Sequence, residues 1–140
     1  MLRCRGVDPK NAKISVFGLG YVGCVSAACL AAEGNEVIGV DVNQTKVDMI
    51  NQGKSPIVEK DLDATLKEVV GSTSYAGGSL IATTDEEKAV LDTDVSLICV
   101  GTPSKDNGDL DIAYVLKCAD GIGAGLKKKD GYHVVVARST

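Results

Sequence analysis

The chain has 140 residues, of which 44% are hydrophobic and 24% are charged. This is the composition of one folded globular domain, and it excludes a wholly disordered chain. Fifteen basic and 19 acidic side chains give a net charge of −4 at pH 7, and there is no tryptophan. Both features argue against nucleic-acid binding, which needs a basic surface and aromatic side chains for stacking.

The five cysteines are scattered along the chain and include no C-x-x-C pair. That spacing predicts neither a disulfide framework nor a zinc site. Three of the cysteines lie in apolar runs, where a free cysteine behaves as a small hydrophobic residue. We therefore expect a protein of the reducing cytoplasm with no metal site.

Residues 1–12 precede the first predicted element and are interpreted as an N-terminal extension or a remnant of cloning. Their basic residues, followed by the apolar segment 21–32, superficially resemble a secretory signal. Glycines interrupt that apolar segment, however, and it is shorter than the ~20 residues that cross a bilayer. We expect no membrane partner and a single domain over residues 13–140.

Strands and helices alternate in the first half of the chain. A short β-rich run ends in glycine, and a helix-like apolar segment then ends before Gly34. The next strand is apolar on both faces, which is typical of a central parallel strand. The predicted elements are, in order, strand 13–18, helix 20–32, strand 36–41, helices 44–51 and 61–70, and strand 80–84.

The alternation continues in the second half. The helix predicted over 110–126 carries apolar residues at helical spacing, and the lysines at 127–129 are expected to answer the negative end of its own dipole. The predicted elements are helix 86–91, strand 95–100, helix 110–126 and strand 133–137. This order predicts an α/β fold, a Rossmann-type doubly wound parallel sheet with helices on both faces.

A glycine motif lies between the first strand and the first helix. Gly18, Gly20 and Gly23 form a G-x-G-x-x-G, which is specific only in such a strand–helix context. Gly18 would permit the tight turn, Gly20 would let a pyrophosphate approach the backbone, and Gly23 would let the helix pack against the strand. The phosphates would bind the free N–H groups at the start of the helix.

An acidic residue ends the second strand. Asp41 lies 18 positions after Gly23, where its carboxylate would accept hydrogen bonds from both hydroxyls of an adenosine ribose. A carboxylate there repels a 2′-phosphate, so NAD is predicted rather than NADP. Lys46 could reach a ribose hydroxyl too, or could simply face the solvent.

The end of the fourth strand carries Gly101, Thr102 and Pro103. Ligands bind beyond the carboxyl ends of parallel strands, near the switch between the two halves of the sheet. Gly101 would allow close backbone approach and Thr102 would offer a hydroxyl, although a simple turn has the same sequence. Thr140, after the fifth strand, would face the same crevice. The one histidine, His133, is interpreted as structural, and no catalytic residue is visible.

The combined motifs resemble the N-terminal half of the UDP-glucose/GDP-mannose dehydrogenase family. The resemblance spans residues 13–140 and rests on FGLGYVG, EVIGVDVNQTKVDMINQGKSPIVE, ATTDEEKAVLDTDVSLICVGTPSKDNGDLD and VVVARST. INQGKSPIVE and CVGTPS-x-x-NGDLD are most similar to the members that act on GDP-mannose. The sequence departs from the family at residues 59–62, which read Glu-Lys-Asp-Leu where the family has Glu-Pro-Gly-Leu.

The resemblance implies an oxidoreductase that oxidises the 6-hydroxyl of a nucleotide sugar to a carboxylate with two NAD, a step of polysaccharide biosynthesis. It implies NAD contacts from the backbone of Tyr21 and Val22, and from Asp41, Lys46, Thr102 and Thr140. The family's catalytic cysteine and lysine lie in motifs that these 140 residues do not contain. The chain alone is therefore expected to bind NAD but to be inactive.

Three alternatives stay open. The nucleotide sugar could be GDP-mannose, which the motifs favour, or UDP-glucose. The chain could instead be a stand-alone NAD-sensing module, which also has a glycine motif and an acid at a strand end. It could also be a fragment without a function of its own, whose exposed sheet edge would favour self-association as a homo-oligomer.

Overall fold

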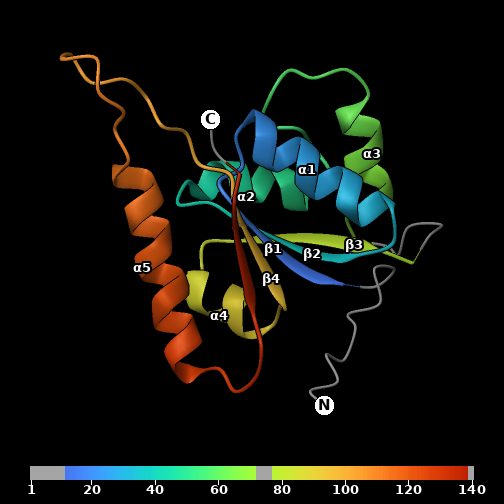
Figure 1. Cartoon of the computed structure of the whole chain (residues 1–140). Helices are drawn as coiled ribbons and strands as arrows, with labels where there is room; N and C mark the ends of the chain where they lie inside the picture. The colour runs from blue at the N-terminus through green and yellow to red at the C-terminus, as the bar shows by residue number, and fades with distance from the viewer. Residues whose placement is uncertain (1–11, 72–76, 139–140) are drawn as a thin grey trace.

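The computed structural model describes residues 12–71 and 77–138 (Figure 1). Five parallel strands form one sheet in the order β3-β2-β1-β4-β5. Because β1 lies between β2 and β4, the chain changes direction across the sheet at the carboxyl end of β1, which is where such folds bind ligands. The strands are β1 (Lys13–Phe17), β2 (Glu36–Val40), β3 (Ser79–Thr83), β4 (Val95–Ile98) and β5 (Val134–Ala137).

Helices cover both faces of the sheet, as the sequence predicts. Figure 1 shows α1, α2 and α3 on one side of the strands and α4 and α5 on the other. The helices are α1 (Tyr21–Ala32), α2 (Gln44–Asn51), α3 (Leu62–Val69), α4 (Glu86–Leu91) and α5 (Ala113–Lys128). No helix of the described segments is long and apolar enough to cross a membrane.

Alternation along β1 divides the core into two layers. Ile14 and Val16 face the layer beneath α1 and α3, whereas Phe17 faces the layer beneath α4 and α5. Both layers exclude solvent from β1, since Val16 and Phe17 are at most 1% exposed. Side chains at successive positions point to opposite faces of a strand, so a parallel strand buried on both faces needs an apolar run.

The outer edge of β3 is occupied by two other parts of the chain. The Asn51 side chain donates to the Ala82 carbonyl at 2.9 Å and accepts from the Ala82 N–H at 2.8 Å. Val70 forms a parallel bridge with Leu80. The side-chain amide therefore completes the ladder as a neighbouring strand would.

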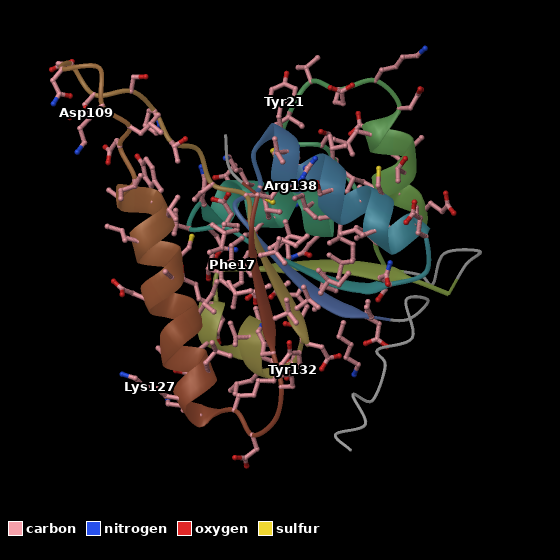
Figure 2. All side chains as sticks on the ribbon, in the orientation of Figure 1. Phe17, Tyr21, Asp109, Lys127, Tyr132 and Arg138 are labelled. Carbon is pink, nitrogen blue, oxygen red and sulfur yellow. The ribbon has the colours of Figure 1, made fainter. Side chains whose placement is uncertain are left out.

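The predicted boundaries need two corrections around residues 99–112. β4 ends at Ile98 rather than residue 100, and α5 begins at Ala113 rather than residue 110. Between them Ser104 bridges Leu110 in antiparallel fashion around a turn at Gly108, whose φ is +86°. This small hairpin projects from the body of the molecule, with Asp109 near its tip (Figure 2). The hairpin is absent from the predicted elements, although the Asn-Gly dipeptide at 107–108 is a common hairpin turn signal.

The buried face of α5 differs from the predicted one. Cys118, Ile122 and Gly125 are buried at i, i+4 and i+7. The spacing predicts an apolar face made of Ile112, Val115, Leu116, Ala119, Ile122 and Leu126, but Leu116 is 56% exposed and Ile112 is 48% exposed.

Lys127 and Lys128 lie in the last turn of α5, as predicted for cations that answer its dipole, but Lys128 and Lys129 also contact α4 and the residues that follow it. Lys128 forms an ion pair with Glu87 of α4 at 2.9 Å. Lys129 donates to the carbonyl of Val90 at 2.9 Å and to that of Thr93. Lys128 therefore ties the end of α5 to α4, and Lys129 adds a donor to carbonyls at and just beyond the end of α4.

Candidate functional site

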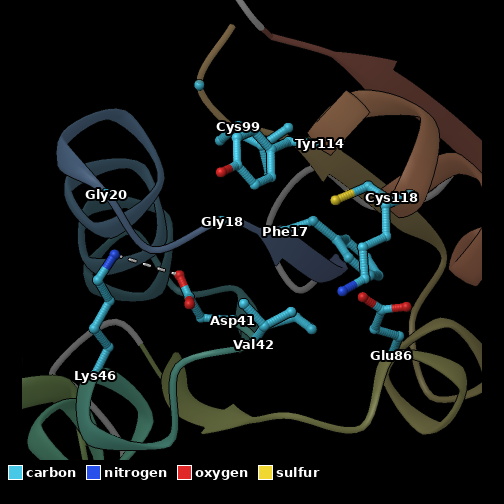
Figure 3. Close-up of a pocket in the computed structure, with 14 residues that line it drawn as sticks. Phe17, Gly18, Gly20, Asp41, Val42, Lys46, Glu86, Cys99, Tyr114 and Cys118 are labelled. Carbon is cyan, nitrogen blue, oxygen red and sulfur yellow. Dashed lines mark ion pairs between the residues drawn. The ribbon is translucent and has the colours of Figure 1, made fainter. Parts of the chain in front are cut away.

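A cavity of about 310 Å³ opens at the carboxyl ends of β1, β2 and β4 (Figure 3). Its walls come from six parts of the fold: the end of β1 with the glycine turn, the end of β2, the residues after β4, α2, α4 and α5. The lining residues are Phe17, Gly18, Gly20, Val40, Asp41, Val42, Lys46, Glu86, Cys99, Val100, Gly101, Tyr114, Lys117 and Cys118.

Gly18 makes the turn at the base of this cavity. Its φ is +92°, and its N–H donates to the Val40 carbonyl at 2.8 Å. A Cβ on Gly18 would lie 2.9 Å from Val100 Cγ1. Both the left-handed backbone and the close neighbour therefore require glycine.

Gly20 and Gly23 have different surroundings. A Cβ on Gly23 would lie 1.7 Å from the Gly18 carbonyl oxygen, so the helix can approach the turn only without a side chain there. A Cβ on Gly20 would meet nothing within 4 Å. Gly20 is the N-cap of α1 and has no side chain to satisfy the N–H groups of the first turn. The start of α1 therefore combines open space with backbone N–H groups that the helix itself does not pair, which is the usual setting for a phosphate at a helix N-terminus.

Asp41 lies at the end of β2 with its carboxylate against the glycine turn. Oδ2 accepts from the Leu19 N–H at 2.8 Å and Oδ1 from the Asn43 N–H at 2.9 Å. Lys46 Nζ lies 3.7 Å from Oδ2 (Figure 3). The side chain is 10% exposed, and each ionised oxygen has a further lone pair for a ligand hydroxyl.

The opposite side of the cavity combines apolar and ionisable groups. Figure 3 shows Glu86 and Cys118 across the cavity from Lys46 and Gly20, with Phe17 and Val42 between. Burial raises the pKa of the Cys118 thiol, and the Glu86 carboxylate adds to the effect. Burial also raises the pKa of Cys99. Both thiols are therefore protonated at neutral pH and are poor nucleophiles.

His133 lies outside this cavity, in a polar cluster between β1 and β4. Nε2 lies 2.8 Å from Ser96 Oγ, and Nδ1 lies 3.1 Å from the Thr93 carbonyl. Because a carbonyl only accepts, Nδ1 carries the proton and Nε2 accepts from the Ser96 hydroxyl. Ser96 in turn bonds Ser15 at 2.7 Å, so every member has a partner and the role is structural.

The predicted site residues separate into three groups. Gly18, Gly20, Asp41, Lys46 and Gly101 line the cavity together. Gly23 lies behind the turn, while Tyr21 and Val22 occupy the first turn of α1 and are 57% and 42% exposed. Thr102 follows Gly101 and is half-buried, and Thr140 lies outside the described residues.

Sequence reasoning missed most of the wall opposite Lys46. Phe17 and Val40 could have been found, because each directly precedes a predicted site residue. Tyr114, Lys117 and Cys118 depend on how α5 packs, which no local pattern specifies. Glu86 was predicted only as part of a short helix. Within the described residues no group of His, Cys, Asp and Glu side chains could hold a metal ion.

Comparison with known proteins identifies the family. Residues 12–140 match the model of the UDP-glucose/GDP-mannose dehydrogenase family, NAD binding domain. The chain belongs to this family. NAD is therefore the cofactor of the domain, as the glycine motif and Asp41 predict.

Relatives within the family include several nucleotide-sugar dehydrogenases. The chain is 58% identical over 128 residues to GDP-mannose 6-dehydrogenase of Pseudomonas aeruginosa and 38% identical to UDP-glucose 6-dehydrogenase AglM of Haloferax volcanii. Each match covers 91% of the chain but 28% of the relative. The chain thus spans under a third of the length of these proteins.

Solved structures of family members share the fold. A ternary complex of GDP-mannose dehydrogenase from Pseudomonas aeruginosa superimposes with a TM-score of 0.84 over 91% of this chain and 28% of that chain, at 58% identity. A UDP-glucose dehydrogenase from Pyrobaculum islandicum gives 0.85 over 96% of this chain and 30% of that chain, at 36% identity. The Rossmann-type architecture predicted from the sequence is thereby confirmed.

Proposed function

We propose that this chain is the cofactor-binding part of a nucleotide-sugar 6-dehydrogenase that converts GDP-mannose to GDP-mannuronate. The choice of sugar nucleotide is supported by the identities, 58% to a GDP-mannose 6-dehydrogenase against 38% to a UDP-glucose 6-dehydrogenase. Oxidising a 6-hydroxyl to a carboxylate removes four electrons, so each sugar nucleotide requires two NAD.

The residues around the cavity fit a dinucleotide. The open space above Gly20 and the donors at the start of α1 suit a pyrophosphate, with the Tyr21 and Val22 backbone in contact. Lys46, Gly101 and Thr102 are proposed as further contacts, and Thr140 stays a prediction. When bound, NAD supplies the hydride acceptor, while this chain binds and orients it.

The position of the Asp41 carboxylate is the observation that best supports the proposal. This carboxylate is fixed by two backbone N–H groups and lies beside the glycine turn, where the pyrophosphate is proposed. Fixed in this way, it accepts from both ribose hydroxyls and repels a 2′-phosphate. The site is therefore selective for NAD over NADP.

The catalytic groups are proposed to lie outside the described residues. Burial raises the pKa of Cys24 to about 11, and the pKa values of Cys99 and Cys118 are also raised. None of these thiols forms a thiolate readily, as covalent catalysis would require. We therefore expect the 140-residue chain to bind NAD and to produce no NADH from GDP-mannose.

Calorimetric titration of the chain with NAD and with NADP tests the proposal. Wild type should bind NAD at least about tenfold more tightly, as expected for one charge-assisted interaction. Asp41→Asn keeps an acceptor for the Leu19 N–H but loses the charge, so the preference should fall to about twofold.

Asp48→Asn is the matched control, because Asp48 is an exposed residue of α2 whose carboxylate accepts from the Gln44 side chain and does not line the cavity. It should leave the preference at its wild-type value. A folded wild-type chain that binds neither dinucleotide would contradict the proposal, and so would equal affinity for both.

A further inference from the structure

The wall of the cavity opposite Lys46 carries a carboxylate that the proposed contacts do not use. Glu86 is half-buried and lines the cavity, and its side chain makes no hydrogen bond or ion pair with any residue that the structure describes. We propose that Glu86 recognises the 6-amino group of the adenine of NAD and makes the site selective for adenine over a 6-oxopurine. This inference rests on the proposed function.

The position of Glu86 follows from the packing of α4 against α5. A Cβ on Gly121 of α5 would lie 2.0 Å from Glu86 Oε2. The carboxylate therefore lies against the backbone of α5, in the space that a side chain at residue 121 would occupy. From there it faces the same cavity as Cys118 (Figure 3).

The direction of the bound dinucleotide places its base at this wall. The pyrophosphate is proposed beside Gly20 and the adenosine ribose at Asp41. Figure 3 shows Gly20 and Lys46 on one side of Asp41 and Glu86 on the other. A base attached to that ribose, pointing away from the phosphates, therefore enters the part of the cavity between Val42 and Cys118.

The chemistry of that part suits a purine with an amino group at position 6. Phe17, Val40, Val42 and Tyr114 supply apolar and aromatic walls for a flat ring. An ionised carboxylate only accepts hydrogen bonds. Adenine offers an N6 donor, whereas hypoxanthine and guanine present an O6 acceptor that the carboxylate would repel.

One cation also reaches this wall. Lys117 of α5 lines the cavity but is exposed to solvent. Its ammonium could donate to O6 of a 6-oxopurine and so acts against the preference set by Glu86. Removing Lys117 should therefore leave the preference for adenine intact or increase it.

Titration with NAD and with nicotinamide hypoxanthine dinucleotide tests the proposal. Wild type should bind NAD at least about tenfold more tightly, the value of one lost hydrogen bond to a charged group. In Glu86→Ala the ratio should fall to about two or less through weaker NAD binding. Glu86→Gln should also level the ratio, because an amide can donate to O6 or accept from N6.

Glu87→Ala is the matched control, because the neighbouring carboxylate pairs with Lys128 and does not line the cavity. It should keep the wild-type ratio, whereas Lys117→Ala should keep it or raise it. Equal affinity of wild type for the two dinucleotides would overturn the assignment of Glu86 while leaving NAD binding in place, and so would a tenfold ratio that survives in Glu86→Ala. Binding of neither dinucleotide by folded wild type would overturn the proposed function itself.

Discussion

The carboxylate of Asp41 accepts a hydrogen bond from the backbone N–H of Leu19 at 2.8 Å. Leu19 is the middle residue of the glycine turn and is fully buried. One side chain therefore holds the end of β2 against the turn that follows β1, so the proposed ribose and pyrophosphate subsites have a fixed relative position before any ligand binds. Such preorganisation lowers the entropy cost of binding.

This bond predicts a loss of stability when Asp41 is truncated. Asp41→Ala leaves the Leu19 N–H without its partner, and the free energy of unfolding should fall by about 1–3 kcal/mol. Asp41→Asn retains an acceptor oxygen and should lose less than half of that. Urea unfolding followed by circular dichroism measures both variants; equal losses would show that the hydrogen bond to Leu19 is not the cause.

Substitutions at Gly20 and Gly23 should have different effects: the first should weaken NAD binding, and the second should destabilise the fold. Gly23→Ala places a Cβ 1.7 Å from the Gly18 carbonyl oxygen, a backbone atom that cannot move aside. Its free energy of unfolding should fall by about 3 kcal/mol or more. Gly20→Ala enters open space, so it should change stability by under about 1 kcal/mol and still weaken NAD binding at least tenfold. Thermal unfolding and NAD titration of both variants check this contrast. A Gly20→Ala chain with normal NAD affinity would place the pyrophosphate elsewhere.

The backbone of Asp61 has a left-handed conformation that favours glycine. Asp61 has a φ of +63°, and it is the one non-glycine residue with positive φ among residues 12–71 and 77–138. It takes the position of the glycine in the family's Glu-Pro-Gly-Leu, and its side chain makes no capping bond to α3. Asp61→Gly should be more stable than Asp61→Ala by about 1 kcal/mol, because only glycine adopts this conformation without strain. Urea midpoints of the two variants provide the measurement, and the reverse order would contradict it.

His133 should make stability depend on pH. Burial, followed by the nearby Lys129 ammonium, lowers its pKa below 6.5 in the folded chain, although hydrogen bonding to Thr93 and the Asp94 charge act in the opposite direction. With the folded pKa below the unfolded one, the unfolded chain binds more protons as the pH falls below about 6.5. The neutral imidazole therefore contributes full stability above pH 6.5, and that contribution is lost as the pH falls toward the folded pKa.

His133 is the single histidine of the sequence, so one variant isolates its effect. The difference in unfolding free energy between wild type and His133→Gln should shrink as the pH is lowered from 7.5 to 5.5. Carboxylate titrations common to both proteins cancel in that difference. A difference that stays constant, or grows at low pH, would contradict the predicted direction.

The sequence predicts the elements well where a local pattern determines them. The glycine motif needs a strand before it and a helix after it, and the apolar runs at β1, β2 and β4 are typical of strands that a parallel sheet buries on both faces. It predicts less well where the partner is distant. Lys129 lies near the end of its own helix in sequence but bonds carbonyls at the end of α4, a choice made by the packing of the two helices.

The same reasoning separates the two sides of the site. Gly18, Gly20 and Asp41 are spaced along one strand–helix–strand unit, so their meeting follows from the spacing alone. Glu86 lines the cavity because α4 packs on α5, with its carboxylate against Gly121. Nothing in the residues around position 86 specifies that contact, and no alternation or motif could have found it.

The pairing of Asn51 and Val70 with β3 also affects how the chain meets other chains. Leu80 and Ala82 are the residues of β3 that turn their backbone groups away from β2, and both have partners. An approaching strand would find no free donor or acceptor at these two residues. Edge-to-edge aggregation requires such unpaired backbone groups as its template. Asn51 therefore protects the chain against growth of the sheet from this side, and its replacement by alanine would reopen that edge for intermolecular β-pairing.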